Sequence, residues 1–244
     1  MAVDFRHDGV RSSLVWDVLS TVVAARVAAT GRSALDIVDV GGGTGILSVP
    51  FAALGHNVTV VDPSPDALAA AQRRAAEAGA RLASVQADAA SLASVVGPDA
   101  ADLVICHNVL EYVEDPADAM NAMACVLRPA ATVSVRAANA MAAVLQRALA
   151  GRFAEARAVL TAPQAPRADG TRRFTLPELV ALTEQAGLQV GEMHGLRVFT
   201  GLIPGTLLDG DAAAAEALRA LEEAAASTPP LRDIAAQLHL LGHR

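Results

Sequence analysis

Short apolar runs alternate with amphipathic stretches along the first half of the chain. Residues 35–40 have the pattern of a buried strand, which leads into a glycine cluster and then into the apolar helix pattern of residues 46–54. The same alternation predicts further strands at 57–61, 81–86, 101–107 and 131–136, and further helices at 67–78 and from Asp115-Pro116 onward. Strands that alternate with helices indicate a parallel, doubly wound α/β sheet.

The rhythm changes after residue 138. Residues 139–160 predict one helix, and residues 161–173 predict a loop. A helix at 176–186, a strand at 188–193, a helix at 212–226 and a last strand at 235–241 follow. We therefore interpret residues 1–244 as a single domain. It comprises an N-terminal helical cover (1–34), a core that binds the ligand (35–137), an insertion for the substrate (138–174) and a C-terminal part that completes the sheet (175–244).

Composition narrows the class of protein. Hydrophobic residues make up 53% of the 244 positions, but every apolar run ends well before the roughly 20 residues that a membrane span requires. The first eight residues are charged and lack the apolar core of a secretory signal, so we expect a cytoplasmic protein. Cys106 and Cys125 lack the spacing of metal ligands, which favours buried reduced thiols and no metal site.

Charge is distributed unevenly along the chain. The net charge of -7 argues against general nucleic-acid binding. Between residues 128 and 173, however, eight arginines face only two acids, Glu155 and Asp169, so this segment carries +6. It is either an ordinary solvated surface or an anion-binding patch, and the second interpretation makes tRNA a candidate partner.

The glycine cluster is the first candidate for chemistry. Its sequence is Asp39-Val40-Gly41-Gly42-Gly43-Thr44-Gly45, between a predicted strand and its helix. Glycine lets a ligand approach the backbone, although such a cluster can also serve only to make a tight turn. A dinucleotide fingerprint that starts at Gly41 requires a sixth-position glycine, where this chain has Ile46. The pattern favours a ligand without a pyrophosphate, whose amino-acid portion and ribose pack against the turn.

Two aspartates follow the next two predicted strands. Asp62 lies 21 residues after Gly41, where a carboxylate can accept hydrogen bonds from both ribose hydroxyls. Asp88 ends the third strand, where it can accept from an adenine amino group. Helix capping is the alternative role for each. Because open α/β sheets bind ligands at the carboxyl ends of their strands, the glycine turn and both aspartates predict one site.

These motifs, together with Asp102-Leu103-Val104-Ile105, resemble the successive motifs of class I S-adenosylmethionine-dependent methyltransferases. The resemblance covers residues 35–137. It implies a Rossmann-like α/β fold with a seven-stranded, mostly parallel sheet whose last strand is antiparallel, and S-adenosylmethionine as cofactor. The cofactor contacts that it implies are at Gly41, Gly42, Gly43, Asp62, Asp88 and Ala89.

A narrower resemblance extends over more of the chain. The segments 107–116, 126–129, 139–140 and 195–199 are similar to the bacterial tRNA 5-carboxymethoxyuridine methyltransferases. This likeness implies that Arg11 holds the cofactor carboxylate and that His107 contacts the cofactor. The alternative for His107 is a strand-end histidine whose hydrogen bonds the backbone satisfies. The chain departs from the group where Ala137-Ala138 replace an aromatic residue before Asn139.

Methyl transfer from a sulfonium is an in-line displacement, so the enzyme must chiefly align its reactants. A carboxylate acceptor is already ionised at neutral pH and needs no general base. The candidates on the substrate side are Tyr112, Asn139 and Arg197. Arg197 is the residue that we expect to hold a carboxylate, the alternative being a surface arginine stacked on Phe199.

Three functions are compatible with this pattern. The first is methyl esterification of the wobble uridine of tRNA, with the segment 128–173 on the phosphates and Tyr112 or Phe174 near the base. The second is methylation of a small carboxylate, phenol or amine. The third is a non-catalytic protein that binds S-adenosylmethionine.

Overall fold

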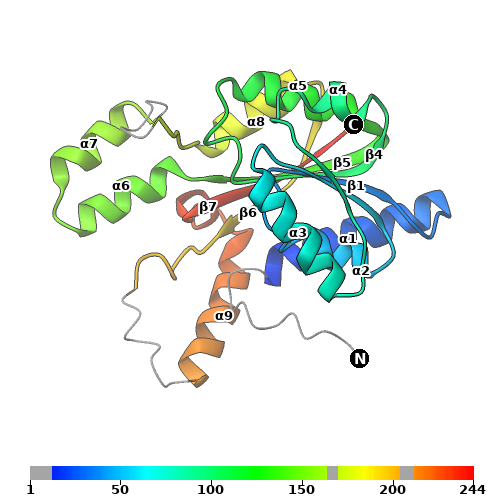
Figure 1. Ribbon diagram of the computed structural model, residues 1–244. Coiled ribbons are helices and arrows are strands. Elements are labelled where there is room, and N and C mark those ends of the chain that lie inside the picture. The colour runs from blue at the N-terminus through cyan, green and yellow to red at the C-terminus, as the bar shows by residue number, and fades with distance from the viewer. Residues whose placement is uncertain (1–12, 164–169, 204–211) are drawn as a thin grey trace.

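The computed structural model describes residues 13–163, 170–203 and 212–244 (Figure 1). Arg11, the residue expected to hold the cofactor carboxylate, lies outside these ranges. No helix among the described residues is long and apolar enough to cross a membrane.

Seven strands form one sheet in the order β3-β2-β1-β4-β5-β7-β6. Strands β1 to β5 pair in parallel, whereas β7 lies between β5 and β6 and is antiparallel to both. This confirms the class I methyltransferase topology that the sequence predicts. The bounds are Asp36–Val40 for β1, Asn57–Val61 for β2, Ala83–Val85 for β3, Ala101–His107 for β4, Leu127–Ala138 for β5, Gln189–Leu196 for β6 and Gln237–His243 for β7.

Helices cover both faces of the sheet (Figure 1). One face packs against α4 (Leu92–Val96), α5 (Pro116–Val126) and α8 (Leu176–Gln185), and the other against α1 (Ser13–Thr30), α2 (Ser48–Ala53) and α3 (Pro65–Glu77). Two further helices, α6 (Ala140–Leu149) and α7 (Phe153–Thr161), project from the edge at which β5 ends. The last, α9 (Ala212–Ala226), contacts β6.

The alternation of side chains along the strands divides the core between the two faces. Val38, Val104 and Val133 point toward α5 and α8, where they join the larger apolar cluster. Ile37 and Ile105 point the other way, into the cluster under α1 and α2. The buried strands are therefore apolar on both faces, as parallel sheets require.

Side chains cap the starts of three helices. The Ser64 side chain accepts a hydrogen bond from the Ala67 N–H at the start of α3, and the Asp115 carboxylate accepts two N–H groups at the start of α5. Thr175 and Glu178 form a capping box on α8. These caps therefore fix the residue at which each of the three helices begins.

Two expectations were wrong. The helix predicted over 139–160 is two helices, because Gly151 adopts a φ of 73° that ends α6 before α7 begins. Cys125 was expected to be buried, but it is exposed because α5 turns that residue away from the sheet, whereas Cys106 is buried. Both β5 and β6 also extend beyond their predicted ends.

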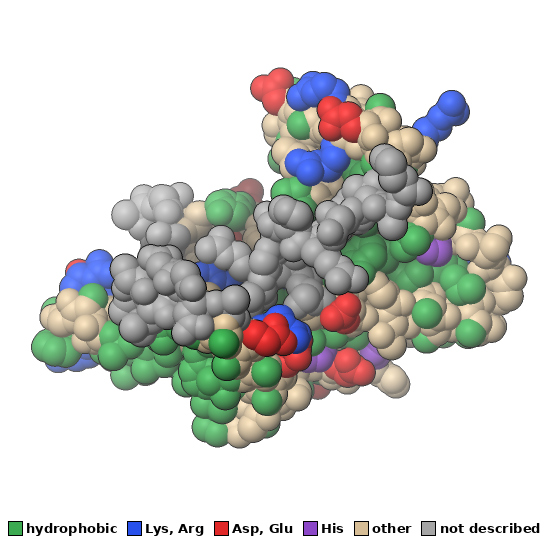
Figure 2. Space-filling view, turned by 90° about the horizontal axis from the view of Figure 1, so that it is seen from below, with side chains coloured by type: hydrophobic (Ala, Val, Ile, Leu, Met, Phe, Trp, Pro, Cys, Tyr) green, Lys and Arg blue, Asp and Glu red, His purple; other side chains and the backbone are tan. Residues whose placement is uncertain are grey.

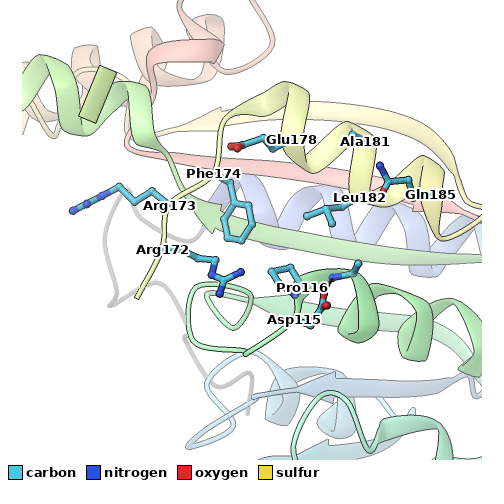
Figure 3. Close-up of a pocket in the computed structure, with 10 residues that line it drawn as sticks. Asp115, Pro116, Arg172, Arg173, Phe174, Glu178, Ala181, Leu182 and Gln185 are labelled. Atoms are coloured by element: carbon cyan, nitrogen blue, oxygen red, sulfur yellow. Dashed lines mark hydrogen bonds between the residues drawn. The ribbon is translucent and has the colours of Figure 1, made fainter. Parts of the chain in front are cut away.

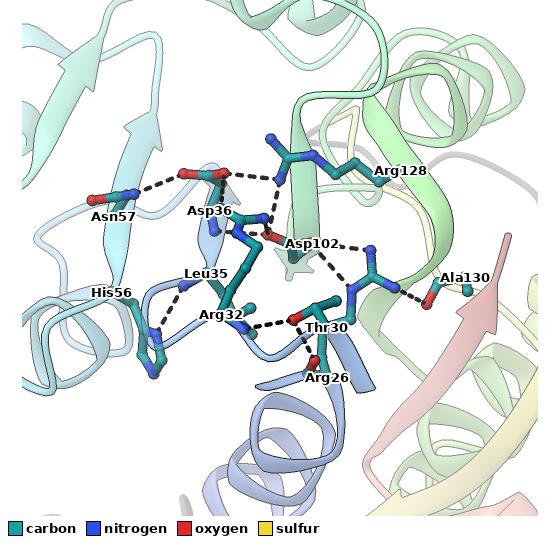
Figure 4. Close-up of polar contacts among 10 residues, drawn as sticks. All are labelled: Arg26, Thr30, Arg32, Leu35, Asp36, His56, Asn57, Asp102, Arg128 and Ala130. Carbon is teal, nitrogen blue, oxygen red and sulfur yellow. Dashed lines mark hydrogen bonds and ion pairs between the residues drawn. The ribbon is translucent and has the colours of Figure 1, made fainter. Parts of the chain in front are cut away.

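Asp102 at the start of β4 is a buried carboxylate that joins three segments (Figure 4). It forms ion pairs with Arg26 of α1, Arg32 and Arg128, and it accepts the Asp36 N–H at 3.0 Å. Its side chain is fully buried. The network therefore fastens α1 and the start of β5 to the edge of the sheet opposite the carboxyl ends of the strands.

We expect Asp102→Asn to lower the free energy of unfolding by about 3 kcal/mol, because it leaves three guanidinium groups around a neutral amide. Urea denaturation measures the change. Arg32→Gln is the matched control, since its side chain is 39% exposed and its loss costs about 1 kcal/mol or less. Equal losses for the two variants would contradict the central role of Asp102.

Candidate active site

The carboxyl ends of the parallel strands meet at one edge of the sheet. This edge brings together the glycine turn after β1, Asp62 after β2, the 86–91 loop after β3 and the 107–114 segment at the end of β4. The end of β5 adjoins them. The residues that the sequence assigns to one site are thus neighbours in the fold.

The glycine turn packs closely against neighbouring side chains. Gly41 and Gly43 have φ angles of 64° and 55°, and the Gly41 N–H donates to the Val61 carbonyl at 2.7 Å. A Cβ on Gly42 would lie 2.6 Å from Asp39 Oδ2. A Cβ on Gly41 would collide with Val109 from the segment after β4. Only glycine fits at these two positions, so the backbone forms the surface of the site.

Asp39 supports the turn from inside the protein. It is buried at the end of β1, and the Ser48 hydroxyl donates to its Oδ2. Burial raises the pKa of the Asp39 carboxyl to about 6. Sequence reasoning assigned Asp39 no role beyond its place in the glycine motif. In the structure, Asp39 supports the backbone beneath Gly42.

Asp62 is hydrogen bonded to the glycine turn. Its Oδ2 accepts the Gly43 N–H at 3.0 Å, and its Oδ1 accepts the Ser64 N–H at 2.8 Å. The residue is buried. A carboxylate offers about four acceptor positions, so two remain for the ribose hydroxyls that the sequence assigns to it.

Asp88 and Ala89 follow β3 at the same edge. Asp88 is exposed and accepts the Ser91 N–H at 2.8 Å. Hydrogen bonding from the Ser91 side chain, and then from its backbone N–H, holds the pKa of the Asp88 carboxyl below the ordinary value. Ala89 is buried. Asp88 thus holds the turn before α4, whose N-cap is Ser91, and its exposure at the edge of the site leaves the predicted adenine contact open to it.

His107 ends β4 and begins a line of hydrogen bonds across the sheet. Its Nε2 lies 2.8 Å from Ser134 Oγ, which lies 2.8 Å from His239 Nε2. His239 Nδ1 then lies 3.2 Å from His194 Nδ1. The hydrogen bond of His107 is therefore to a side chain, not to the backbone as the alternative interpretation supposed.

These histidines are neutral at physiological pH. Burial lowers the pKa of His239 to about 3, and neighbouring His194 and Arg136 contribute. Burial also lowers the pKa of His107 well below its ordinary value, and the positive charge of Arg136 adds to the effect. A neutral imidazole can both donate and accept hydrogen bonds, which suits a chain of this kind.

The three candidates on the substrate side occupy different environments. Tyr112 is 73% exposed after β4. Asn139 is buried, and its amide nitrogen donates to the carbonyls of Asp233 and Ala235 while its oxygen caps α6. Arg197 is partly buried after β6 with a φ of 60°. Asn139 therefore positions α6, and Tyr112 is the most accessible of the three.

Two charged residues at this edge were missed by sequence reasoning. Arg136 lies near the end of β5, beside His107 in register. Glu111 is buried; its Oε1 accepts the Ala138 N–H at 2.7 Å, and burial raises the pKa of its carboxyl. The available signal was that Thr132, Ser134 and Arg136 are polar at alternate positions of β5, between the apolar residues Val133, Val135 and Ala137.

A hollow of about 300 Å³ lies on the α5 and α8 side of this edge (Figure 3). Arg172 extends toward the start of α5, and its guanidinium donates to the Glu114 carbonyl at 3.1 Å. Arg173 points away from the hollow (Figure 3). Phe174 also lines it, so one aromatic ring and one arginine of the predicted insertion lie beside the 107–114 segment.

The arginines of segment 128–173 do not share one surface. Arg128 belongs to the Asp102 network at the opposite edge, and Arg147 and Arg152 both lie near Glu155. On the face shown in Figure 2, basic side chains form separate spots, several of them beside acidic ones. Within the described residues, Arg172 and Arg173 are the arginines of this segment that lie at the hollow.

Comparison with known proteins identifies relatives. The family model described as a methyltransferase domain matches residues 38–135. The chain is 33% identical over 162 residues to a ubiquinone biosynthesis O-methyltransferase of Aeromonas salmonicida, a match that covers 66% of this chain and 65% of that protein. It is 29% identical over 198 residues to a tRNA 5-carboxymethoxyuridine methyltransferase of Escherichia coli O157:H7, covering 78% and 71%. The chain thus spans just under two thirds of the length of the first relative.

The fold has parallels among solved structures. A magnesium protoporphyrin IX methyltransferase from Synechocystis PCC 6803, with bound S-adenosylhomocysteine, superposes with a TM-score of 0.57. The match covers 94% of this chain and 82% of that one at 17% identity. At this identity the likeness concerns the fold alone, and it agrees with the strand order described above.

We expect Asp62→Ala to weaken the binding of S-adenosylhomocysteine roughly 10- to 150-fold, because it removes charge-assisted hydrogen bonds worth about 1.5 to 3 kcal/mol. Calorimetry measures the affinity. Asp66→Ala, an exposed carboxylate in the first turn of α3, is the matched control. Unchanged affinity of the Asp62 variant would overturn the ribose assignment.

The buried histidine makes stability depend on pH. The pKa of His239 falls from 6.5 to about 3 on folding, so below pH 6.5 the unfolded chain binds a proton that the folded chain does not. The wild type should therefore lose stability relative to His239→Gln by about 1.4 kcal/mol per pH unit between about pH 6 and 4. Urea denaturation across this range measures it. A stability difference independent of pH would contradict the burial of a neutral imidazole.

Proposed function

The chain belongs to the class I S-adenosylmethionine-dependent methyltransferases, and on this premise we propose that it methylates the carboxylate of 5-carboxymethoxyuridine at the wobble position of tRNA. The observation that carries the methyl-transfer part of the proposal is the hydrogen-bonded unit of the glycine turn and Asp62. It lies at the carboxyl edge of the sheet, where this class of fold binds its ligands.

The residues at this edge fit S-adenosylmethionine. The backbone of Gly41 and Gly42 forms an open surface that a Cβ would disturb, and Asp62 keeps acceptor positions for a ribose. Asp88 and Ala89 follow on the next strand along the sheet, as an adenine that extends from the ribose requires. The cofactor supplies a methyl group on a positively charged sulfur.

The remaining task of the protein is to place an acceptor in line with that methyl group. A carboxylate acceptor is ionised at neutral pH, so no residue must remove a proton from it. The neutral state of His107 at the end of β4, where it is hydrogen bonded to Ser134, is compatible with this chemistry. Alignment of the acceptor with the methyl group, together with the negative charge of the carboxylate, is therefore sufficient for the transfer.

The choice of tRNA is supported by the Escherichia coli relative and by the hollow beside the 107–114 segment. The relative matches 78% of this chain, which includes the region after β5 where substrates are bound in our interpretation. The hollow combines the Phe174 ring with Arg172. Stacking on an aromatic ring and contact between arginine and phosphate are the usual means of holding an unpaired base of RNA.

A small-molecule phenol is the second candidate acceptor. It is favoured by the Aeromonas relative, an O-methyltransferase. A phenol must lose a proton, and the lowered pKa of His107 makes this imidazole a weak base for that step. The two candidates differ in their response to salt. Transfer to tRNA should fall steeply as salt rises, whereas transfer to a small phenol should not.

Tritium transfer from labelled S-adenosylmethionine tests the proposal. The substrate is bulk tRNA from cells that lack this gene, digested to nucleosides after the reaction. We expect base-labile label in a modified wobble uridine, because the product is an ester. No transfer to this tRNA by protein that binds S-adenosylhomocysteine would contradict the tRNA proposal and favour the phenol.

Replacement of Arg172 and Arg173 together by Ala should weaken tRNA binding and reduce its salt slope by about 1 for each phosphate that the variant no longer neutralises. Affinity for S-adenosylhomocysteine should not change. Filter binding at several salt concentrations measures both the affinity and the slope for tRNA. The matched control replaces Arg73 and Arg81, two exposed arginines elsewhere. Equal tRNA affinity for this control and the Arg172/Arg173 variant would remove the role of the hollow.

A further inference from the structure

Arg136 is a partly buried arginine for which the described part of the chain supplies no ion pair. It lies two residues before the end of β5, and its guanidinium forms no hydrogen bond or ion pair with any residue that the structure describes. Its Nε is buried and lacks a partner. Arg26 and Arg128, which are also partly buried, both form ion pairs with Asp102. Arg136 is thus treated differently from the arginines that support the fold.

A partly buried guanidinium without an ion pair lowers the stability of the fold. Burial lowers the pKa of Arg136, but a guanidinium stays protonated in proteins, so the charge persists. Removing an ion from water costs several kcal/mol unless an opposite charge compensates for it. A structural role would be served better by an apolar side chain. The cost therefore points to an anion that Arg136 meets during function.

Two carboxylates attract the Arg136 guanidinium without contacting it. Glu111 and Asp39 are the nearby carboxylates, and neither forms an ion pair with it. Burial raises the pKa of both carboxyls, that of Asp39 to about 6, so Asp39 is still largely ionised at neutral pH. His107 and His239, its partners in register on β4 and β7, are neutral. Among the described residues, Arg136 therefore has negative charges nearby but no carboxylate that contacts its guanidinium.

Arg136 lies at the carboxyl edge of the sheet, on the strand after the predicted cofactor contacts. Residues in register on neighbouring strands point to the same face, and Ser134 bonds both His107 and His239, so Arg136 shares their face. Its backbone carbonyl also accepts the Asn108 N–H at 2.8 Å. The cofactor contacts that the sequence predicts lie at the ends of β1, β2 and β3, with His107 at the end of β4, and β5 lies next to β4 on the side away from β1.

We propose that Arg136 binds the carboxylate of the methyl acceptor, an assignment that rests on the proposed function and names its recognition residue. Bidentate contact with a guanidinium fixes a carboxylate in both position and orientation. Methylation converts the anion into a neutral ester, which gives up this contact. Arg136 thus favours the unmethylated acid over the product, and it joins Arg197, whose Nε is also buried without a partner among the described residues, as a candidate for this role.

Nuclear magnetic resonance of the Arg136 side chain tests the proposal directly. The probes are methoxyacetate and its neutral methyl ester, added to protein saturated with S-adenosylhomocysteine. The Nε–H signal of Arg136 is assigned by its absence from Arg136→Met. Arg136→Lys keeps the charge without the planar fork, and Arg81→Met is the matched control at an exposed arginine.

We expect methoxyacetate to shift the Arg136 signal saturably and to bind Arg136→Met at least about tenfold more weakly. Arg136→Lys should be intermediate, Arg81→Met should equal the wild type, and the ester should bind all four proteins alike. The affinity for S-adenosylhomocysteine should be the same in each protein. Thermal unfolding confirms that the variants are folded.

Two results would overturn the assignment. Equal binding of methoxyacetate to the wild type and Arg136→Met would remove the anion site. Loss of S-adenosylhomocysteine affinity in Arg136→Met, with no binding of methoxyacetate to the loaded wild type, would assign the guanidinium to the cofactor's own carboxylate. If methoxyacetate binds through Arg136 but tRNA accepts no methyl group, the carboxylate site stands and the tRNA proposal fails.

Discussion

Parallel pairing of β1, β2, β4 and β5 is the constraint on which the candidate site depends. It places the carboxyl ends of four strands at one edge, so that residues up to 97 positions apart, Asp39 and Arg136, approach each other. The Asp102 network secures the opposite edge by joining α1 and β5 to the start of β4. With that edge fixed, the loops at the carboxyl edge are free to carry chemistry instead of stability.

Burial of polar groups gives the edge its electrostatic character. Near the carboxyl ends of β4 and β5, His107, Ser134 and Arg136 share one face of the sheet. Withdrawal from water keeps the histidines neutral and raises the pKa of the nearby carboxyls, while Arg136 stays positive. The same desolvation lowers the stability of the fold and leaves the Arg136 guanidinium without an ion pair among the described residues.

Local signals were enough to predict the strands, the glycine turn and Asp62, because each depends on residues close in sequence. The break at Gly151 was missed because the apolar helix pattern continues on both sides of it, and one glycine within a helix is often tolerated. The line from His107 through Ser134 to His239 joins residues 27 and 105 positions apart. Pairing of that range depends on strand order, which periodicity does not determine.

A crystal structure of the protein with S-adenosylhomocysteine tests the central claim most directly. We predict that the ribose hydroxyls donate to Asp62, that the amino-acid portion lies on the glycine turn, and that the sulfur faces the ends of β4 and β5. The Arg136 guanidinium should then remain available on the acceptor side of the sulfur. A ribose bound away from Asp62, or a cofactor carboxylate paired with Arg136, would contradict this arrangement.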